Sequence, residues 1–172
     1  INLIDGSSVW LVSLCAVLNR FPVRGHILLK AEIERDVLSR ELVELEHFRL
    51  WEPNDVEVEG RVLPNKLVDA LSNIDEVDPL DVVIVRGRRA SVTLAASKRF
   101  DGRLWPYLTD IPQSAAEMTE ERIEELSGVF DASDRILCQT ESLRSFLASF
   151  FPDHDQKMIL LPPMVPDEAF AV

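Results

Sequence analysis

Short runs of consecutive apolar residues alternate along the chain with longer stretches in which apolar residues recur every three or four positions. The short runs are typical of strands that are covered on both faces, as in a parallel sheet, and the longer stretches are typical of helices. We expect strands at 1–4, 26–29, 48–51, 80–85, 104–108, 135–138 and 158–161. We expect helices at 9–18, 33–45, 64–77, 90–100, 119–130 and 141–150. We interpret the acidic segment 53–61 as a loop, with a short edge strand around Val56 and Val58 as the alternative.

Strands that alternate with helices of about 10 to 15 residues indicate βαβ units, whose parallel strands share one sheet. We therefore predict an α/β fold over residues 1–161, a Rossmann-like, doubly wound domain. Its mostly parallel sheet has about six or seven strands and carries helices on both faces. The tail, 162–172, holds Pro162, Pro163 and Pro166, which cannot extend a strand or a helix, so we interpret it as the start of a linker.

The chain is acidic, with 18 Lys and Arg against 30 Asp and Glu and a formal net charge of -12. This charge opposes approach to a polyanion, so we expect no nucleic-acid partner, although a local basic patch is compatible with it. The longest dense apolar stretch, 9–18, is shorter than the about 20 residues that a bilayer span requires. Cys15 and Cys138 lie in apolar stretches, so we interpret them as reduced core residues of a cytoplasmic protein.

In an open parallel sheet, ligands bind outside the carboxyl ends of the strands, so the loops after the predicted strands hold the candidate site residues. In the first loop, Asp5–Ser8, Gly6 permits a tight turn, and Gly6 and Ser7 lie at a helix start whose free amides favour an anion. The loop lacks the G-x-G-x-x-G pattern of nicotinamide dinucleotide sites. The alternative is structural, with Gly6 turning the chain and Ser7 or Ser8 capping the helix.

Three arginines gather around Gly87 after the predicted strand 80–85, which we expect near the centre of the sheet; they are Arg86, Arg88 and Arg89. The planar fork of arginine suits phosphate or carboxylate, so Arg86 and Arg88 are candidate ligands of a phosphorylated compound. The alternative is a solvated loop whose arginines pair with nearby acids.

Thr109 and Asp110 follow the predicted strand 104–108, which contains Trp105 and Tyr107. A carboxylate beside aromatic rings suits a sugar hydroxyl, which makes Asp110 a candidate catalytic residue and Thr109 a candidate binding residue. Alternatively, Asp110 accepts hydrogen bonds from backbone amides as a structural cap. Thr140, after the strand 135–138, is most economically a helix N-cap, although the same helix start faces the predicted crevice.

Other polar groups carry no predicted site. Asp153, His154 and Asp155 resemble a metal-binding triplet but lie between a helix and a strand on the side away from the crevice, so we interpret them as a solvated turn. His26 and His47 have no Ser or Cys nucleophile at a recognisable spacing, which leaves a hydrolytic triad unsupported.

Taken together, several segments resemble the amino-terminal half of a GT-B glycosyltransferase, most closely those of glycosyltransferase family 4 and the group 1 glycosyl transferases. They are the Asp-Gly-Ser-Ser loop, the strand 80–87, the segment 105–112, the unit 135–147 and the tail 161–167. The last unit of such domains reads as a strand, a small polar residue, a helix with a Leu or Phe stripe, and a strand that ends in a Pro-Asn-Gly-Val-Asp-like linker. Pro163-Met164 stands here where that family often has Asn-Gly.

The resemblance implies a second Rossmann-like domain, which holds the nucleotide sugar and carries the E-x7-E acids, with the active site between the two domains. This chain would be the acceptor half of an enzyme that transfers a hexosyl group to a glycan, a lipid or a small molecule, and it would be inactive alone. The implied catalysis stabilises the leaving diphosphate with basic side chains and helix amides, without a metal or another cofactor. By position, Gly6 and Ser7 would approach the donor phosphates or the acceptor, and Arg86, Arg88 and Asp110 would line the acceptor pocket, where Asp110 would orient the acceptor hydroxyl or take its proton.

The resemblance also implies a cytoplasmic location, with peripheral attachment to the inner membrane face left open. The competing interpretation is a Rossmann-like module without catalysis, whose crevice binds a nucleotide or a partner. A native sequence that continues into a second domain of alternating strands and helices with a late E-x7-E pair would separate the two interpretations.

Overall fold

The computed structural model describes residues 6–35, 39–109, 112 and 114–163, and it confirms an α/β fold with parallel strands. The chain divides into two compact units, the first running up to Leu63 and the second comprising Pro64–Pro162. Among the described residues, two strands form a sheet in the first unit and four form a sheet in the second. The described strands therefore form two sheets where the sequence predicts one, and the strand predicted at 1–4 lies outside the described residues.

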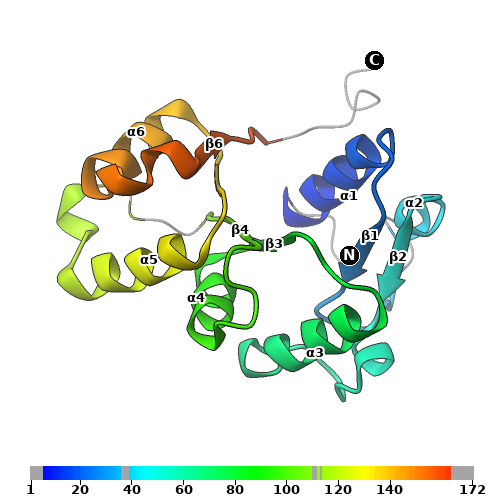
Figure 1. Ribbon diagram of the computed structural model, residues 1–172. Helices are drawn as coiled ribbons and strands as arrows, with labels where there is room; N and C mark the ends of the chain where they lie inside the picture. The colour runs from blue at the N-terminus through cyan, green and yellow to red at the C-terminus, as the bar shows by residue number, and fades with distance from the viewer. Residues whose placement is uncertain (1–5, 36–38, 110–111, 113, 164–172) are drawn as a thin grey trace. The chain divides into compact units, whose positions relative to one another are not determined.

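The first unit holds two parallel strands and the helices that pack on them (Figure 1). Its elements are α1 (Gly6–Leu18), β1 (Gly25–Leu28), α2 (Ser39–Val43), β2 (Phe48–Trp51) and the short 3-10 helix η1 (Pro53–Val56). Ile27 pairs with Leu50 across the two strands, and its side chain is buried with Val12 of α1 and Leu42 of α2. Gly25 pairs with Phe48, and a Cβ at Gly25 would lie 2.1 Å from the Phe48 ring, so a side chain at this position would displace that ring.

The helix predicted at 33–45 is found, among the described residues, only as α2. Residues 32–35 are not helical, Ile33 donates its backbone N–H to the Glu52 carboxylate at 2.9 Å, and Ala31 forms an antiparallel bridge with Arg61. Contacts with residues distant in sequence therefore hold the backbone where the apolar spacing predicts the start of the helix.

The second unit is a run of βα repeats whose four parallel strands follow their order in the chain, β3-β4-β5-β6 (Figure 1). Its helices are α3 (Pro64–Val77), α4 (Arg88–Ser97), α5 (Glu120–Ala132) and α6 (Glu141–Phe150), with the 3-10 helices η2 (Ala115–Glu117) and η3 (Pro152–Lys157). Its strands are β3 (Val83–Arg86), β4 (Leu104–Tyr107), β5 (Ile136–Cys138) and β6 (Met158–Leu160). Among the described strands of this sheet, β3 stands at one end, so the central position that the sequence predicts for it stays a prediction.

One face of the four-stranded sheet carries the apolar core of the second unit. The strand register places Val83 beside Leu104 and Ile136 beside Met158, with their side chains on that face. Val83 and Leu104 pack with Leu94 of α4, and Ile136 and Met158 pack with Leu126 of α5 and Leu147 of α6. The buried residues of the larger cluster are Leu108, Met118, Leu126, Val129, Phe130, Ile136, Cys138, Leu147, Phe151 and Met158.

Pro106 lies in β4, between β3 and β5, although proline has no N–H for a sheet. On the β3 side, Gly87 donates to the Tyr107 carbonyl at 3.0 Å and Val83 donates to the Arg103 carbonyl at 2.8 Å. Alternate residues of a parallel strand bond to opposite neighbours, so the missing donor of Pro106 faces β5. Accordingly, β4 and β5 share one residue pair within the two strands, Tyr107 with Leu137.

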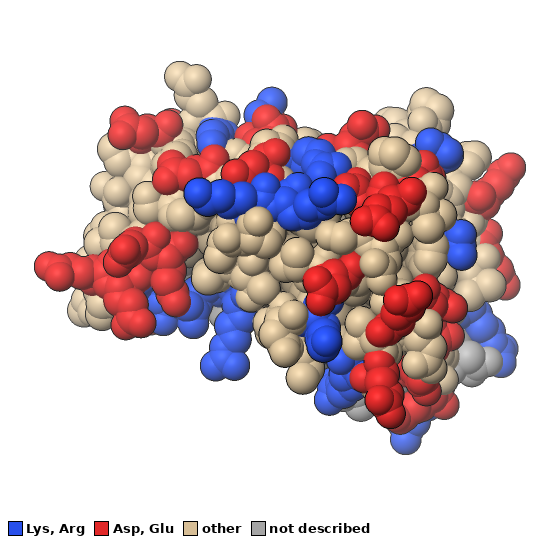
Figure 2. Space-filling view, turned by 60° about the horizontal axis from the view of Figure 1, so that its bottom comes forward, with Lys and Arg blue, Asp and Glu red and all other residues tan. Residues whose placement is uncertain are grey.

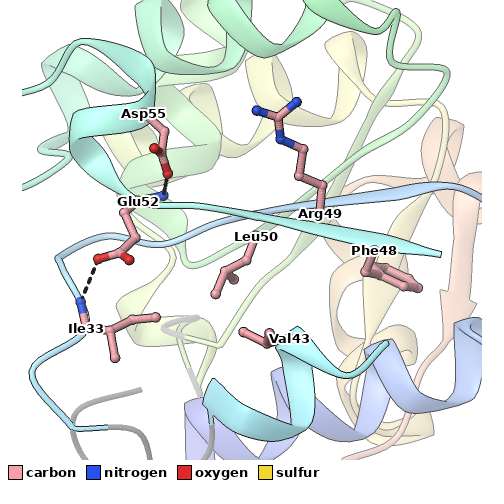
Figure 3. A pocket seen from close by; sticks show the side chains of 7 residues that line it. All are labelled: Ile33, Val43, Phe48, Arg49, Leu50, Glu52 and Asp55. Atoms are coloured by element: carbon pink, nitrogen blue, oxygen red, sulfur yellow. Dashed lines mark hydrogen bonds between the residues drawn. The ribbon is translucent and has the colours of Figure 1, made fainter. Parts of the chain in front are cut away.

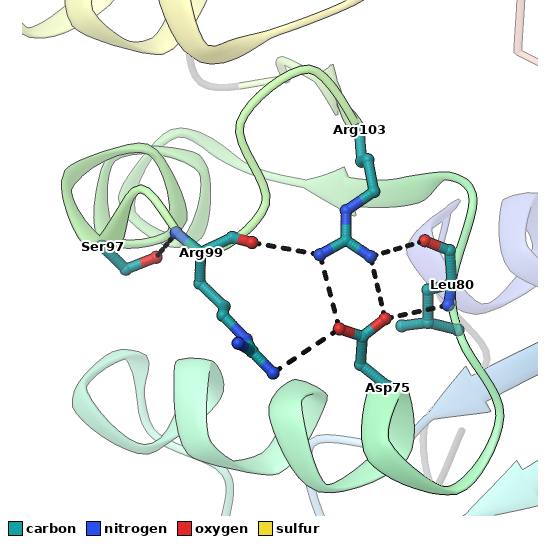
Figure 4. A network of polar contacts seen from close by, with 5 residues as sticks. All are labelled: Asp75, Leu80, Ser97, Arg99 and Arg103. Atoms are coloured by element: carbon teal, nitrogen blue, oxygen red, sulfur yellow. Dashed lines mark hydrogen bonds and ion pairs between the residues drawn. The ribbon is translucent and has the colours of Figure 1, made fainter.

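A polar network ties the amino ends of β3 and β4 to α3 (Figure 4). Asp75, near the end of α3, accepts hydrogen bonds at 2.9 Å from the Leu80 backbone and from the Arg103 guanidinium. Arg103 also donates to the carbonyls of Leu80 and Arg99, at 2.8 and 3.1 Å. The hydrogen bond from Arg103 is the main cause that lowers the pKa of Asp75 below its usual value, 3.8. This network lies at the strand ends opposite to those that precede the candidate loops, and its role is structural.

Candidate functional site

Three predicted site residues lie at one edge of the four-stranded sheet. Arg86 ends β3, Thr109 follows β4, and Thr140 follows β5. Because β3, β4 and β5 are parallel neighbours, their carboxyl ends meet at the same edge. We call this edge, with Arg86, Gly87, Thr109, Thr140 and the first turn of α4, the carboxyl-edge site.

Arg86 is half-buried and pairs with Tyr107 across the strands. Its guanidinium carbon lies 5.9 Å from the centroid of the Tyr107 ring, within the range of a cation–π interaction. This contact holds a positive charge at the end of β3, where the chain turns into α4.

Gly87 makes the turn from β3 into α4 with φ 96° and ψ 144°, a backbone conformation that side-chain-bearing residues rarely adopt. Its carbonyl accepts hydrogen bonds from the Ser91 amide at 3.2 Å and from Ser91 Oγ at 2.9 Å. Ser91 is fully buried, so these two hydrogen bonds fix the turn on its buried side. Gly87 provides no side-chain cap, so the first amides of α4 are directed toward the carboxyl-edge site without a capping side chain.

Arg88 forms an ion pair with Glu125 of α5, and Arg122 lies 3.9 Å from the same carboxylate. The side chains of Arg88 and Glu125 are 21% and 31% exposed, so the pair lies at the surface between α4 and α5. The sequence left open whether the arginines bind a ligand or pair with acids, and Arg88 has an acidic partner. Arg88 therefore ties α4 to α5 beside the carboxyl-edge site.

Thr109 is half-buried and follows the buried Leu108. Asp110, the predicted catalytic residue, lies outside the described residues. The aromatic neighbours expected to form a stacking face are both engaged in the sheet. Tyr107 is 1% exposed, and Trp105 donates its indole N–H to the Asp134 carboxylate at 3.2 Å.

Thr140 is the N-cap of α6, as the sequence predicted, since its hydroxyl accepts a hydrogen bond from the Leu143 amide at 3.1 Å. In the first turn of α6, Glu141 accepts hydrogen bonds from Arg144, which lower the pKa of Glu141 below its usual value. Arg144 also binds Asp155 at 2.7 Å. The start of α6 is therefore a capped and paired helix end, with Thr140 exposed beside it.

Gly6 and Ser7 are the first two residues of α1, which begins three positions before the predicted Val9. They belong to the first unit, whereas Arg86, Thr109 and Thr140 belong to the second. Asp5, in the same predicted loop, lies outside the described residues.

Two of the three histidines, His26 and His154, occupy structural positions. His154 places Nε2 3.2 Å from the Asp131 carboxylate, and its ring meets Phe130 edge-on. His26 accepts a hydrogen bond at Nδ1 from the Trp51 indole at 2.9 Å. The described residues contain no group of three or more His, Cys, Asp or Glu that is arranged to hold a metal ion.

Both cysteines are buried and free. Burial raises the pKa of Cys15 to about 12 and that of Cys138 to about 11. Their thiols are therefore protonated at neutral pH.

Sequence reasoning missed a shallow groove in the first unit, beside β2 (Figure 3). Its volume is about 440 Å³, and it is lined by Ile33, Val43, Phe48, Arg49, Leu50, Glu52 and Asp55. Both carboxylates bind backbone amides, because Glu52 accepts from Ile33 at 2.9 Å and Asp55 accepts from Glu52 at 2.7 Å. The two acidic residues of the groove therefore stabilise the backbone after β2 by accepting hydrogen bonds from its amides. The sequence of the acidic segment does not indicate these hydrogen bonds.

Acidic and basic side chains both occur on the surface face drawn in Figure 2. In the view of Figure 2, Asp and Glu side chains spread over the face, with smaller groups of Lys and Arg between them. Within the part of the chain that the structure describes, no helix combines the length and the apolar composition of a membrane span. Comparisons with family models, with curated proteins and with solved structures found no match to this chain.

Proposed function

We propose that the carboxyl-edge site binds an anionic sugar compound, and that the chain is the acceptor-binding half of a nucleotide-sugar-dependent glycosyltransferase. The observation that carries the proposal is the turn at Gly87, which brings the Arg86 guanidinium and the uncapped first turn of α4 to the same strand end. Guanidinium groups and helix-start amides are the two groups by which proteins most often hold phosphate.

The groups around this turn divide into binding and positioning roles. Arg86 supplies the charge, and the amides at the start of α4 supply hydrogen-bond donors. Arg88 acts as a positioning residue, since its ion pair with Glu125 fixes α4 against α5. Thr109, at the end of the neighbouring strand, offers a hydroxyl at the same edge for a sugar oxygen.

Binding is tested by titrating the chain with hexose phosphates and with the matching free hexoses. We expect the phosphates to bind more tightly, and Arg86→Gln to weaken their binding about tenfold, the loss typical of one hydrogen bond to a charged group. Arg135→Gln is the matched control, because Arg135 precedes β5 at the opposite edge and pairs with Asp134. Absence of phosphate binding, or an equal loss in both variants, would contradict the proposal.

Sugar transfer needs the donor-binding domain that the sequence resemblance implies, so it is tested on the complete encoded protein. We expect release of a nucleoside diphosphate from a nucleotide sugar only when an acceptor is present. The catalytic role of Asp110 stays a prediction from the sequence. Normal turnover by the Asp110→Ala protein would contradict that role.

The second candidate function is a binding module without catalysis. The pairing of Arg88 with Glu125 and the capping role of Thr140 favour it, because they engage two of the predicted binding residues in structural contacts. A complete protein that binds hexose phosphates at the carboxyl-edge site but transfers no sugar from any nucleotide donor would establish this function instead.

A further inference from the structure

The connection between α1 and β1 exposes three large apolar side chains next to two arginines. Val17, in the last turn of α1, is 41% exposed, Phe21 is 55% exposed and Val23 is 39% exposed. Arg20 and Arg24, both exposed, stand on either side of Phe21 and Val23 in the chain. We call these five residues the α1–β1 patch.

The backbone of this connection is held in place by hydrogen bonds, so the apolar side chains are presented by an ordered turn. Arg20 and Phe21 donate to the carbonyls of Val17 and Leu18 at 3.1 and 3.0 Å, which continues the last turn of α1. Val23 donates to the Phe21 carbonyl at 2.8 Å, around Pro22. The side chain of Asn19 accepts a hydrogen bond from the His47 amide at 3.1 Å, which fastens the turn to the segment before β2.

The charged residues in the stretch of sequence around the patch are basic, although the chain as a whole is acidic. No Asp or Glu occurs in the sequence between Asp5 and Glu32, in a chain with 30 acidic residues. Glu46, an exposed acidic residue, precedes His47, whose amide binds Asn19 of the turn. The patch therefore combines apolar side chains with two arginines in a stretch of sequence that holds no acidic residue.

We propose that the α1–β1 patch docks on an anionic phospholipid surface. Phe21 and Val23 enter the boundary between headgroups and acyl chains, and Arg20 and Arg24 bind the lipid phosphates, the two contributions by which peripheral segments hold a membrane. A specific protein partner typically needs about 20 to 30 residues on each side, whereas the patch has five. A lipid surface requires no complementary shape, so it suits a patch of this size.

The patch lies away from the strand ends where ligands bind in α/β folds. It precedes β1, so it stands at the amino end of that strand, whereas ligand crevices form at carboxyl ends. Docking through the patch therefore leaves the carboxyl ends of β1 and β2 free. The inference rests on the patch alone and does not depend on the proposed function.

The test is flotation of the chain with vesicles of phosphatidylcholine alone and of phosphatidylcholine with phosphatidylglycerol. We expect binding to the anionic vesicles only, weakened by salt. Phe21→Ser/Val23→Ser and Arg20→Gln/Arg24→Gln should each weaken it about tenfold. Glu46→Gln should strengthen vesicle binding, because this change removes a negative charge beside the turn.

Val77→Ser and Lys66→Gln are the matched controls, since both residues are exposed on α3, and these changes should leave binding unchanged.

Three outcomes would overturn the proposal. The first is no binding to anionic vesicles by a chain whose circular dichroism shows it to be folded. The second is equal binding by the original chain and by Phe21→Ser/Val23→Ser. The third is a dimer in sedimentation that the Phe21→Ser/Val23→Ser change converts to a monomer, which would identify the patch as a contact between two copies of the chain.

Discussion

At the scale of single residues, Gly87 is the position on which the geometry of the carboxyl-edge site depends most. Its φ of 96° with ψ of 144° strains any residue with a Cβ, so we expect Gly87→Ala to lower the free energy of unfolding by about 1 to 3 kcal/mol. The control is Gly128→Ala in α5, where a Cβ meets nothing within 4 Å. That change should raise stability by about 0.5 to 1 kcal/mol, because alanine favours the helix. Urea unfolding measures both, and equal effects would contradict the strain.

Thr140 allows the capping role to be separated from a binding role. Thr140→Ala removes the hydroxyl that accepts from the Leu143 amide, so we expect a loss of about 1 kcal/mol in the free energy of unfolding. Thr140→Ser keeps the hydroxyl and should retain nearly all of the stability. If Thr140 is only a cap, both variants bind hexose phosphates as the original chain does. A loss of affinity in a folded Thr140→Ala chain would instead assign Thr140 to ligand binding.

At the scale of elements, the Asp75 network joins α3 to the amino ends of β3 and β4, and it makes stability depend on pH. The pKa of Asp75 is lower in the folded chain than its usual value, 3.8, mainly because of the Arg103 hydrogen bond. The stabilisation is therefore fully present above about pH 4 and is lost as the pH falls through the folded pKa. We expect Asp75→Asn to cost about 1 to 2 kcal/mol at neutral pH, and less at pH 3. A cost that is constant from pH 7 to pH 3, measured by denaturant unfolding, would contradict this.

The strands and most helices could be predicted from the sequence because their signals are local. Continuous apolar runs marked β3 and β5, and Thr140 and Pro64 stand at the starts of α6 and α3, where their side-chain chemistry is favoured. The helix predicted at 33–45 is not helical at 33–35, where Ile33 binds Glu52, 19 positions away, a contact that local apolar spacing does not report. The sequence shows three arginines at a strand end but does not show whether an acidic side chain pairs with any of them. The pairing of Arg88 with Glu125, 37 positions away, could therefore not be predicted.

At the scale of the whole molecule, the two units differ in how much of their backbone is hydrogen-bonded in sheets. Among the described residues, the first has two strands of four residues each, and the second has four strands and two apolar clusters. Among the described strands, β1 and β2 each have one hydrogen-bonded neighbour, whereas β4 and β5 each have two, so we expect the amides of β1 and β2 to exchange faster than those of β4 and β5. Hydrogen exchange followed by mass spectrometry measures this, and equal protection of the two sheets would contradict it.

The central claim is that an anionic sugar compound binds where β3 turns into α4. The most direct measurement is an NMR titration of the isotope-labelled chain with a hexose phosphate, with the free hexose as control. We predict that the phosphate shifts the amide signals of Gly87 and Arg88 and of Thr109, and that Arg86→Gln moves the midpoint of these shifts to an about tenfold higher phosphate concentration. Shifts confined to the groove around Leu50 and Glu52, or no saturable shifts at all in the folded chain, would contradict the claim.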